Sequence, residues 1–167
     1  MEKSNDLVIF NSSPLINLAK IDSLNLIEKI YQEVIIPEAV HEEVLVAGEN
    51  KENTKKISNL IDENIIKIKK VSNQELVKSF RIELDYGEAE VLALAIECNA
   101  SLVIIDEIEA RNVAEVYDIP KTGFIGVLIK ADELGLVESG MSLLDTAIKS
   151  GFRISNSLYE HVKNILE

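Results

Sequence analysis

The chain has 167 residues, a hydrophobic content of 47% and a single cysteine, Cys98. This length and apolar content predict one globular domain with a buried core and exclude a disordered chain. A lone cysteine excludes an intramolecular disulfide, and no apolar stretch is long enough to cross a membrane. The net charge of −12 argues against a general nucleic-acid binder, which normally carries a basic surface. The first residues lack the features of a signal peptide, so we expect a cytoplasmic protein.

Short apolar runs alternate with longer segments of helical period along the first half of the chain. Ser13 is expected to cap a helix that begins at Pro14, because proline suits the first helical position. Pro37 should end one strand and open the next helix, and Ser72 begins a capping-box pattern. The strands expected here are 7–10, 34–36 and 65–71, the last at a sheet edge, and a further helix is expected at each of 22–31 and 54–62.

The second half of the chain continues the same alternation. Its most apolar helix, expected at 87–99, should be central, and a fully apolar strand is expected at 102–105. The other expected elements are helices at 109–117, 124–134, 142–149 and 155–166, and a short edge strand with its turn at 119–123. This order of strands and helices predicts an α/β fold with a parallel sheet covered on both faces.

Four polar side chains fall at the expected ends of these strands or the starts of the helices. Asn11 ends the first strand, Asp106 follows the strand at 102–105, Glu88 opens the central helix, and Glu43 lies on the helix after Pro37. Ligands bind where the carboxyl ends of parallel strands meet, and carboxylates gathered there repel one another unless a cation lies among them. The pattern therefore predicts a Mg²⁺ or Mn²⁺ site in which Asn11 is the weakest ligand, because it carries no charge.

Each acid also has an ordinary structural explanation. Asp85 with Glu88, and Asp106 with Glu109, match capping boxes, and Glu43 fits a solvated charge on an amphipathic helix. Asparagine at a strand end is equally typical of a turn. We keep both explanations open, because a capping carboxylate still has oxygen lone pairs for a metal.

Other chemistry finds little support in the sequence. Glycine-rich phosphate loops are absent, which excludes most dinucleotide and ATP chemistry, and neither histidine has the context of a catalytic triad. Arg111 lies just over one turn into the helix after Asp106, so it is the best candidate for a phosphate contact. Ser13 is a second candidate for the substrate phosphate.

Four segments, taken together, resemble the PIN-domain family. They are Ile9-Phe-Asn-Ser-Ser-Pro-Leu-Ile16, Ile36-Pro-Glu-Ala-Val-His-Glu-Glu43, Glu88-Ala-Glu-Val-Leu-Ala-Leu-Ala95 and Leu102-Val-Ile-Ile-Asp106. The segment Thr122-Gly-Phe-Ile-Gly126 adds a similarity to an uncharacterised prokaryotic subfamily of PIN-like proteins, whose members are regarded as predicted nucleic-acid-binding proteins or toxin-type ribonucleases. The similarity spans residues 7 to about 160.

The resemblance implies a PIN-like three-layer sandwich with about five parallel strands. It implies a single domain over 1–167, with a motif-bearing core at 7–136 and C-terminal helices at 138–167. It also implies Mg²⁺- or Mn²⁺-dependent cleavage of RNA, with Asn11, Glu43, Glu88 and Asp106 as the metal-binding and catalytic residues. A homodimer is implied as well, and in toxin members a small antitoxin. The family's first aspartate is Asn11 here, which removes one negative charge from the implied site.

Three hypotheses follow from the sequence. The first is a metal-dependent PIN-like ribonuclease, for which the resemblance includes the toxin of a toxin–antitoxin pair. The second is a catalytically silent PIN-fold module that binds nucleic acid or a protein, which Asn11 and the net charge favour. The third is an unrelated α/β domain whose acids only cap helices.

Apolar stripes on the helices expected at 124–134 and 155–166 also predict a homodimer.

Overall fold

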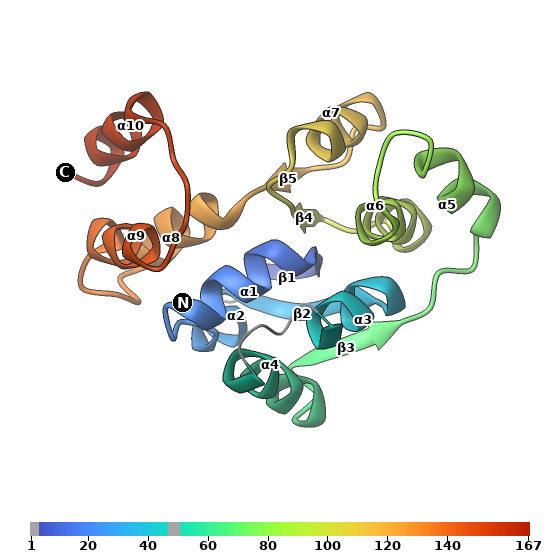
Figure 1. Ribbon diagram of the computed structural model, residues 1–167, viewed down its shortest axis with the longest axis horizontal. Coiled ribbons are helices and arrows are strands. Elements are labelled where there is room, and N and C mark those ends of the chain that lie inside the picture. Colours follow the sequence, from blue (N-terminus) through green and yellow to red (C-terminus); the bar gives the residue numbers. More distant parts are fainter. Residues whose placement is uncertain (1–3, 47–50) are drawn as a thin grey trace.

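A single parallel β-sheet organises the chain, and the computed structural model describes residues 4–46 and 51–167 (Figure 1). Its strand order is β3-β2-β1-β4-β5, and every neighbouring pair is parallel. The strands are β1 (Ser4–Phe10), β2 (Tyr31–Pro37), β3 (Ile66–Lys69), β4 (Leu102–Ile104) and β5 (Lys121–Thr122). This arrangement confirms the predicted α/β fold with five parallel strands.

The helices cover both faces of the sheet. They are α1 (Ser12–Lys20), α2 (Asn25–Ile30), α3 (Glu38–Val46), α4 (Lys51–Asp62), α5 (Gln74–Phe80), α6 (Tyr86–Cys98), α7 (Ile108–Val116), α8 (Phe124–Glu133), α9 (Gly140–Lys149) and α10 (Asn156–Leu166). Figure 1 shows α8, α9 and α10, in orange to red, together at one end of the molecule, with α5, α6 and α7 at the other. Among the residues that the structure describes, no helix is both long and apolar enough to cross a membrane.

The apolar runs become strands because their side chains are buried on both faces of the sheet. Val8, Ile9 and Phe10 of the central strand β1 are almost fully buried, and Val8 pairs with both β2 and β4. At the edge strand β3, Ile66 is buried and the lysines on either side of Ile68 are exposed, as expected for an edge strand, but Ile68 is exposed as well, so the alternation of the sequence holds only in part. The edge strand β5 is shorter than the 119–123 segment in which it was expected.

Helix α6 is the buried helix of the fold, in agreement with its apolar sequence. Its residues 87–95 are buried, and it packs against β1, β2 and β4. The capping box of Asp85 and Glu88 begins the helix, and Asn99 ends it in the left-handed conformation. Two carboxylates, Glu88 and Glu90, are nevertheless buried on this helix. Buried acids need hydrogen-bond partners, and these partners shape the site described below.

Several expected helix starts are wrong by one to three residues. Helix α1 begins at Ser12 with Asn11 as its N-cap residue, whereas Ser13 was expected to cap it. Asn73, and not Ser72, caps α5, because its side chain accepts a hydrogen bond from Leu76 N. Helix α2 begins at Asn25 and not at residue 22, where Asp22 adopts the left-handed conformation, and it ends at Ile30 because the chain enters β2 at Tyr31.

The two apolar stripes that suggested a homodimer have different environments. The stripe on α8 is buried inside the chain, so it offers no surface for a partner, and its use as support for a homodimer is wrong. On α10, Val162 is buried, but Leu158 and Ile165 are exposed. Of the two stripes, only the one on α10 therefore still supports the predicted homodimer, beside the family resemblance.

We predict that the protein sediments as a homodimer at micromolar concentration and that Leu158→Lys shifts it towards the 18.6 kDa monomer. A charge in an apolar interface loses hydrophobic contacts and is desolvated, which weakens association. The matched control is Val116→Lys, because Val116 on α7 is exposed but far along the chain from α10. Sedimentation of the unaltered protein only as a monomer would contradict the prediction.

Candidate active site

The candidate site lies where the carboxyl ends of β1 and β4 meet. From β1 the strand order leads through β2 to β3 on one side and through β4 to β5 on the other, so this is the topological switch point of the sheet. Asn11 directly follows β1, and its backbone N–H donates to the carbonyl oxygen of Ile104 at 2.9 Å. This bond fixes the two strand ends together and brings Asp106, two residues beyond β4, to the same edge.

Asn11 and Ser13 both contact Glu107, an acid that the sequence did not single out. Asn11 Nδ2 donates to Glu107 Oε2 at 3.3 Å, and Ser13 Oγ donates to Glu107 Oε1 at 3.1 Å. Asn11 is only 3% exposed, and its Oδ1 is buried without a hydrogen-bond partner among the described residues. A buried polar oxygen without a partner costs roughly 1–3 kcal/mol, so the site contains an acceptor in need of a ligand.

Asp106 is held from the far side of the site by α8. Its Oδ1 accepts a hydrogen bond from Phe124 N at 2.8 Å, while its Oδ2 is buried and has no partner within the described part of the chain. The expected capping box with Glu109 is wrong, because α7 starts at Ile108 and the N-cap residue is Glu107. A side chain at Gly123 would place its Cβ 2.3 Å from Asp106 Oδ1, so glycine there leaves room for the carboxylate.

Burial is the main cause that raises the pKa of Asp106. The Phe124 N–H opposes this shift, the charge of Glu107 adds to it, and the positive charge of Arg111 lowers the pKa slightly. Burial disfavours the charged form of this carboxyl, and a nearby cation would favour it again.

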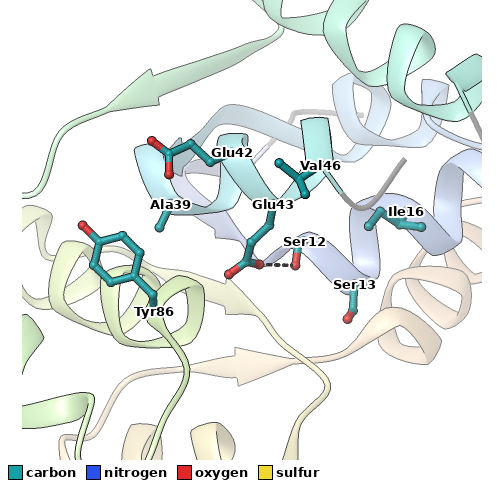
Figure 2. Close-up of a pocket in the computed structure, with 8 residues that line it drawn as sticks. All are labelled: Ser12, Ser13, Ile16, Ala39, Glu42, Glu43, Val46 and Tyr86. Carbon is teal, nitrogen blue, oxygen red and sulfur yellow. Dashed lines mark hydrogen bonds between the residues drawn. The ribbon is translucent and has the colours of Figure 1, made fainter. Parts of the chain in front are cut away.

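Glu43 reaches the site from α3 and lies over the first turn of α6. Ser12 Oγ donates to its Oε2 at 2.7 Å (Figure 2), and a Cβ at Gly87 would come within 2.2 Å of its Oε1. Burial raises the pKa of Glu43, and the Ser12 hydroxyl and the Gly87 backbone lower it. The charges of Asp85 and Glu107 raise it further, so Glu43 is within electrostatic reach of both acids.

Glu88 serves both its own helix and the candidate site. Its Oε2 accepts from Asp85 N at 3.1 Å and its backbone N–H donates to Asp85 Oδ1 at 2.8 Å, which is the predicted capping box. Burial, followed by the charges of Asp85, Glu107 and Glu43, raises the pKa of Glu88 to about 7, although the Asp85 backbone opposes the shift. Capping therefore explains where Glu88 lies, but the capping hydrogen bond does not offset its burial and the repulsion from its neighbours.

Glu90 fixes the helix that carries Glu43. It is buried, and its Oε2 accepts a hydrogen bond from Ala39 N, in the first turn of α3, at 3.0 Å. A carboxylate at a helix N-terminus is stabilised by the free backbone N–H groups and by the helix dipole. Glu90 thus joins α6 to α3 and sets the position from which Glu43 extends. No local pattern in the sequence signals this role, since its partner lies 51 residues away.

The acids lie close enough to influence one another, but they are held apart. Each is fixed by neutral donors: the Ser12 hydroxyl, the backbone N–H groups of Asp85 and Phe124, and the side chains that hold Glu107. In the described residues, no group of three His, Cys, Asp or Glu side chains already converges as a metal ion requires. A cation would therefore have to draw the carboxylates inward from these donors. The donor set is nonetheless made of oxygens, two of them buried without partners, which fits a hard divalent cation.

Arg111 is a basic residue whose charge reaches Asp106. A Cβ at Gly123 would lie 3.2 Å from Arg111 Nη1, and no salt bridge is formed by Arg111 within the described residues. Lys121 is instead paired with Glu115, and the Arg81 guanidinium lies 4.9 Å from the centre of the Tyr86 ring. Among the described residues, Arg111 accordingly offers a guanidinium without a salt bridge beside Asp106.

A pocket of about 510 Å³ opens beside Glu43. Figure 2 shows the Glu43 carboxylate between Tyr86 and Ser12, with Val46 and Ile16 on the side of α3 and α1 away from Tyr86. The lining residues are Ser12, Ser13, Ile16, Ala39, Glu42, Glu43, Val46 and Tyr86. The pocket thus joins polar groups of the candidate site to an apolar wall.

A family model described as a PIN domain matches residues 7–167. No curated protein matches the chain.

We predict that, without metal, the protein becomes less stable as the pH rises from about 4.5 to about 7. The pKa of Glu88 is higher in the folded state than in the unfolded chain, so the folded state binds more protons over this range and loses that advantage as the pH rises. Glu88→Gln removes the carboxyl and should flatten the slope, so that the variant melts above the unaltered protein at pH 8 and close to it at pH 4. Thermal melts in EDTA across this range test it. The control is Glu83→Gln, at an exposed acid; equal slopes for both variants would contradict the prediction.

Proposed function

This chain belongs to the PIN-domain family, and on that premise we propose that it is a divalent-metal-dependent ribonuclease. The PIN domain is a nuclease-type fold, and PIN domains generally depend on divalent metal ions. The observation that carries the proposal is the pair of buried oxygens without partners, Asn11 Oδ1 and Asp106 Oδ2, at the switch point of the sheet. Buried acceptors of this kind, beside further carboxylates, suit a cation.

In this proposal Asn11, Glu43, Glu88 and Asp106 hold Mg²⁺ or Mn²⁺. The metal would activate a water for attack on phosphorus and stabilise the charge that develops on the phosphate oxygens. Asn11 provides a neutral oxygen, and the three acids provide the charge. Burial and the charges of neighbouring acids raise the pKa values of these three carboxyls, and a cation among them would favour their ionised forms.

The substrate would be RNA, held by Arg111 and Ser13 and accommodated in the pocket beside Glu43. Arg111 presents a planar guanidinium that suits a phosphate, and the Ser13 hydroxyl can rotate from Glu107 towards a phosphate oxygen. The net charge of −12 opposes binding of a polyanion, so these local groups and the bound metal must provide the attraction. PIN domains bind nucleic acids and often pair with antitoxins, and we extend to this chain the proposal of a small antitoxin partner.

A catalytically silent PIN-fold module is the alternative. Asn11 in place of an acid favours it, as does the absence, among described residues, of three acids already converged on one point. Such a module would bind nucleic acid or a protein without cleaving RNA. The experiment that separates the two is a calorimetric titration with Mn²⁺ combined with cleavage assays on end-labelled single-stranded RNA. Metal binding with EDTA-sensitive cleavage that Asp106→Asn abolishes supports the ribonuclease, and binding of RNA without cleavage supports the silent module.

We predict that Asn11→Asp tightens the binding of Mn²⁺ by about 1–3 kcal/mol, because it adds a charged oxygen in a buried position. Asp106→Asn should weaken binding, since it removes a charge from the same site. In EDTA, Asn11→Asp should lower the melting temperature, because another like charge then faces Glu107 and the neighbouring acids. Titrations and melts of both variants test this. An Asn11→Asp variant with unchanged affinity and an unchanged melt in EDTA would show that Asn11 does not face the acids.

A further inference from the structure

We propose that Glu107 is an additional metal ligand of this site and supplies the negative charge that Asn11 lacks. The inference rests on the proposed metal-dependent function, and it concerns which residues complete the ligand set. An aspartate at position 11 would have given the site four acids together with Glu43, Glu88 and Asp106. With Asn11 the count falls to three, and Glu107 restores it to four.

The position of Glu107 supports this role directly. Its two carboxylate oxygens accept one hydrogen bond each, from Asn11 Nδ2 and from Ser13 Oγ. Both donors lie in the segment that follows β1, so the Glu107 carboxylate lies against the place that an acid at position 11 would occupy. Each carboxylate oxygen can accept more than one hydrogen bond, so both keep a lone pair for a cation.

Glu107 has no other evident structural function. It occupies the N-cap position of α7, yet its side chain makes no capping hydrogen bond. None of the salt bridges among the described residues involves it. The Glu107 carboxylate thus turns away from its own helix and towards the candidate site.

A second observation points to a ligand between Glu107 and its neighbours. Asn11, the residue that donates to Glu107, is 3% exposed and leaves Oδ1 buried without a partner. Asp106, the preceding residue in the chain, has the same property at Oδ2. Buried acceptors without a partner among the described residues thus lie on two residues next to Glu107, one in hydrogen-bond contact with it and one adjacent in the chain, and such acceptors suit a divalent cation.

The test compares the affinity for Mn²⁺, measured by calorimetry, of the unaltered protein, Glu107→Gln, Glu109→Gln and the double variant Asn11→Asp with Glu107→Gln. We expect Glu107→Gln to weaken binding at least about tenfold, in the range of a lost charged partner. Glu109→Gln removes the same charge from the exposed face of α7 and should leave affinity unchanged. The double variant should recover most of the loss, because the aspartate introduced at position 11 returns the missing charge.

Thermal melts in EDTA provide a readout that is independent of the metal. Glu107→Gln should melt at or above the temperature of the unaltered protein, because a repelling charge is removed. Such a melt would show that the weaker Mn²⁺ binding of this variant does not come from unfolding. Equal Mn²⁺ affinity of Glu107→Gln and the unaltered protein would overturn the inference and leave the proposed function intact. If Glu109→Gln lost as much affinity for Mn²⁺ as Glu107→Gln, the inference would also be overturned, since the loss would then come from the change in net charge. If the unaltered protein binds no Mn²⁺, both the proposed function and this inference are wrong.

Discussion

The repulsion among carboxylates at the carboxyl ends of β1 and β4 is the constraint on which the site and its surroundings depend. Glu43, Glu88, Asp106 and Glu107 gather there, and no salt bridge joins any of them to a base within the described residues. They are tolerated because each carboxylate accepts hydrogen bonds from neutral donors, chiefly hydroxyls and helix N-terminal N–H groups. Such donors lower the free energy of a buried charge without cancelling it. The pKa values of Glu43, Glu88 and Asp106 therefore stay raised, chiefly because of burial and further because of the charges of neighbouring acids.

This constraint explains features of the fold that look unrelated along the chain. The first turns of α6 and α8 both face the acids, and a glycine in or next to each turn, Gly87 and Gly123, lets a carboxylate approach the backbone more closely than a Cβ would allow. Glu90 holds the first turn of α3 against α6 and so keeps Glu43 within reach of that turn. The apolar packing of α6 against the sheet holds the first turn of α6 in place beside the carboxylates, because a helix buried along residues 87–95 cannot shift without opening the core.

The sequence predicted those parts of the fold and site that depend on local contacts. The parallel sheet, the buried central helix and the Asp85–Glu88 capping box follow from hydrophobic period and from partners three residues apart. The Asp106–Glu109 capping box failed because Phe124 N, 18 residues away, is the donor that Asp106 uses. Glu107 was missed for the same reason: its donors lie 94 and 96 residues before it, and the sequence shows only a second acid after Asp106. The buried α8 stripe likewise depends on elements distant in the chain, since α8 packs against α1 and α2 as well as α9 and α10, and this packing has no local signature.

Asparagine at position 11 is best understood within the same balance of charges. A carboxylate there would face Glu107 with no donor between them, whereas the Asn11 amide donates to Glu107 and turns a repulsive contact into a favourable one. Asparagine in place of aspartate at position 11 therefore stabilises the metal-free protein. Part of this stabilisation is lost, because Asn11 Oδ1 is buried and has no partner among the described residues. The residue pair thus retains a net charge of −1 where two acids would carry −2. Compared with a site that has aspartate at position 11, this site is more stable without metal and depends more strongly on Glu107 for its negative charge. The roles of residues 11 and 107 therefore have to be interpreted together.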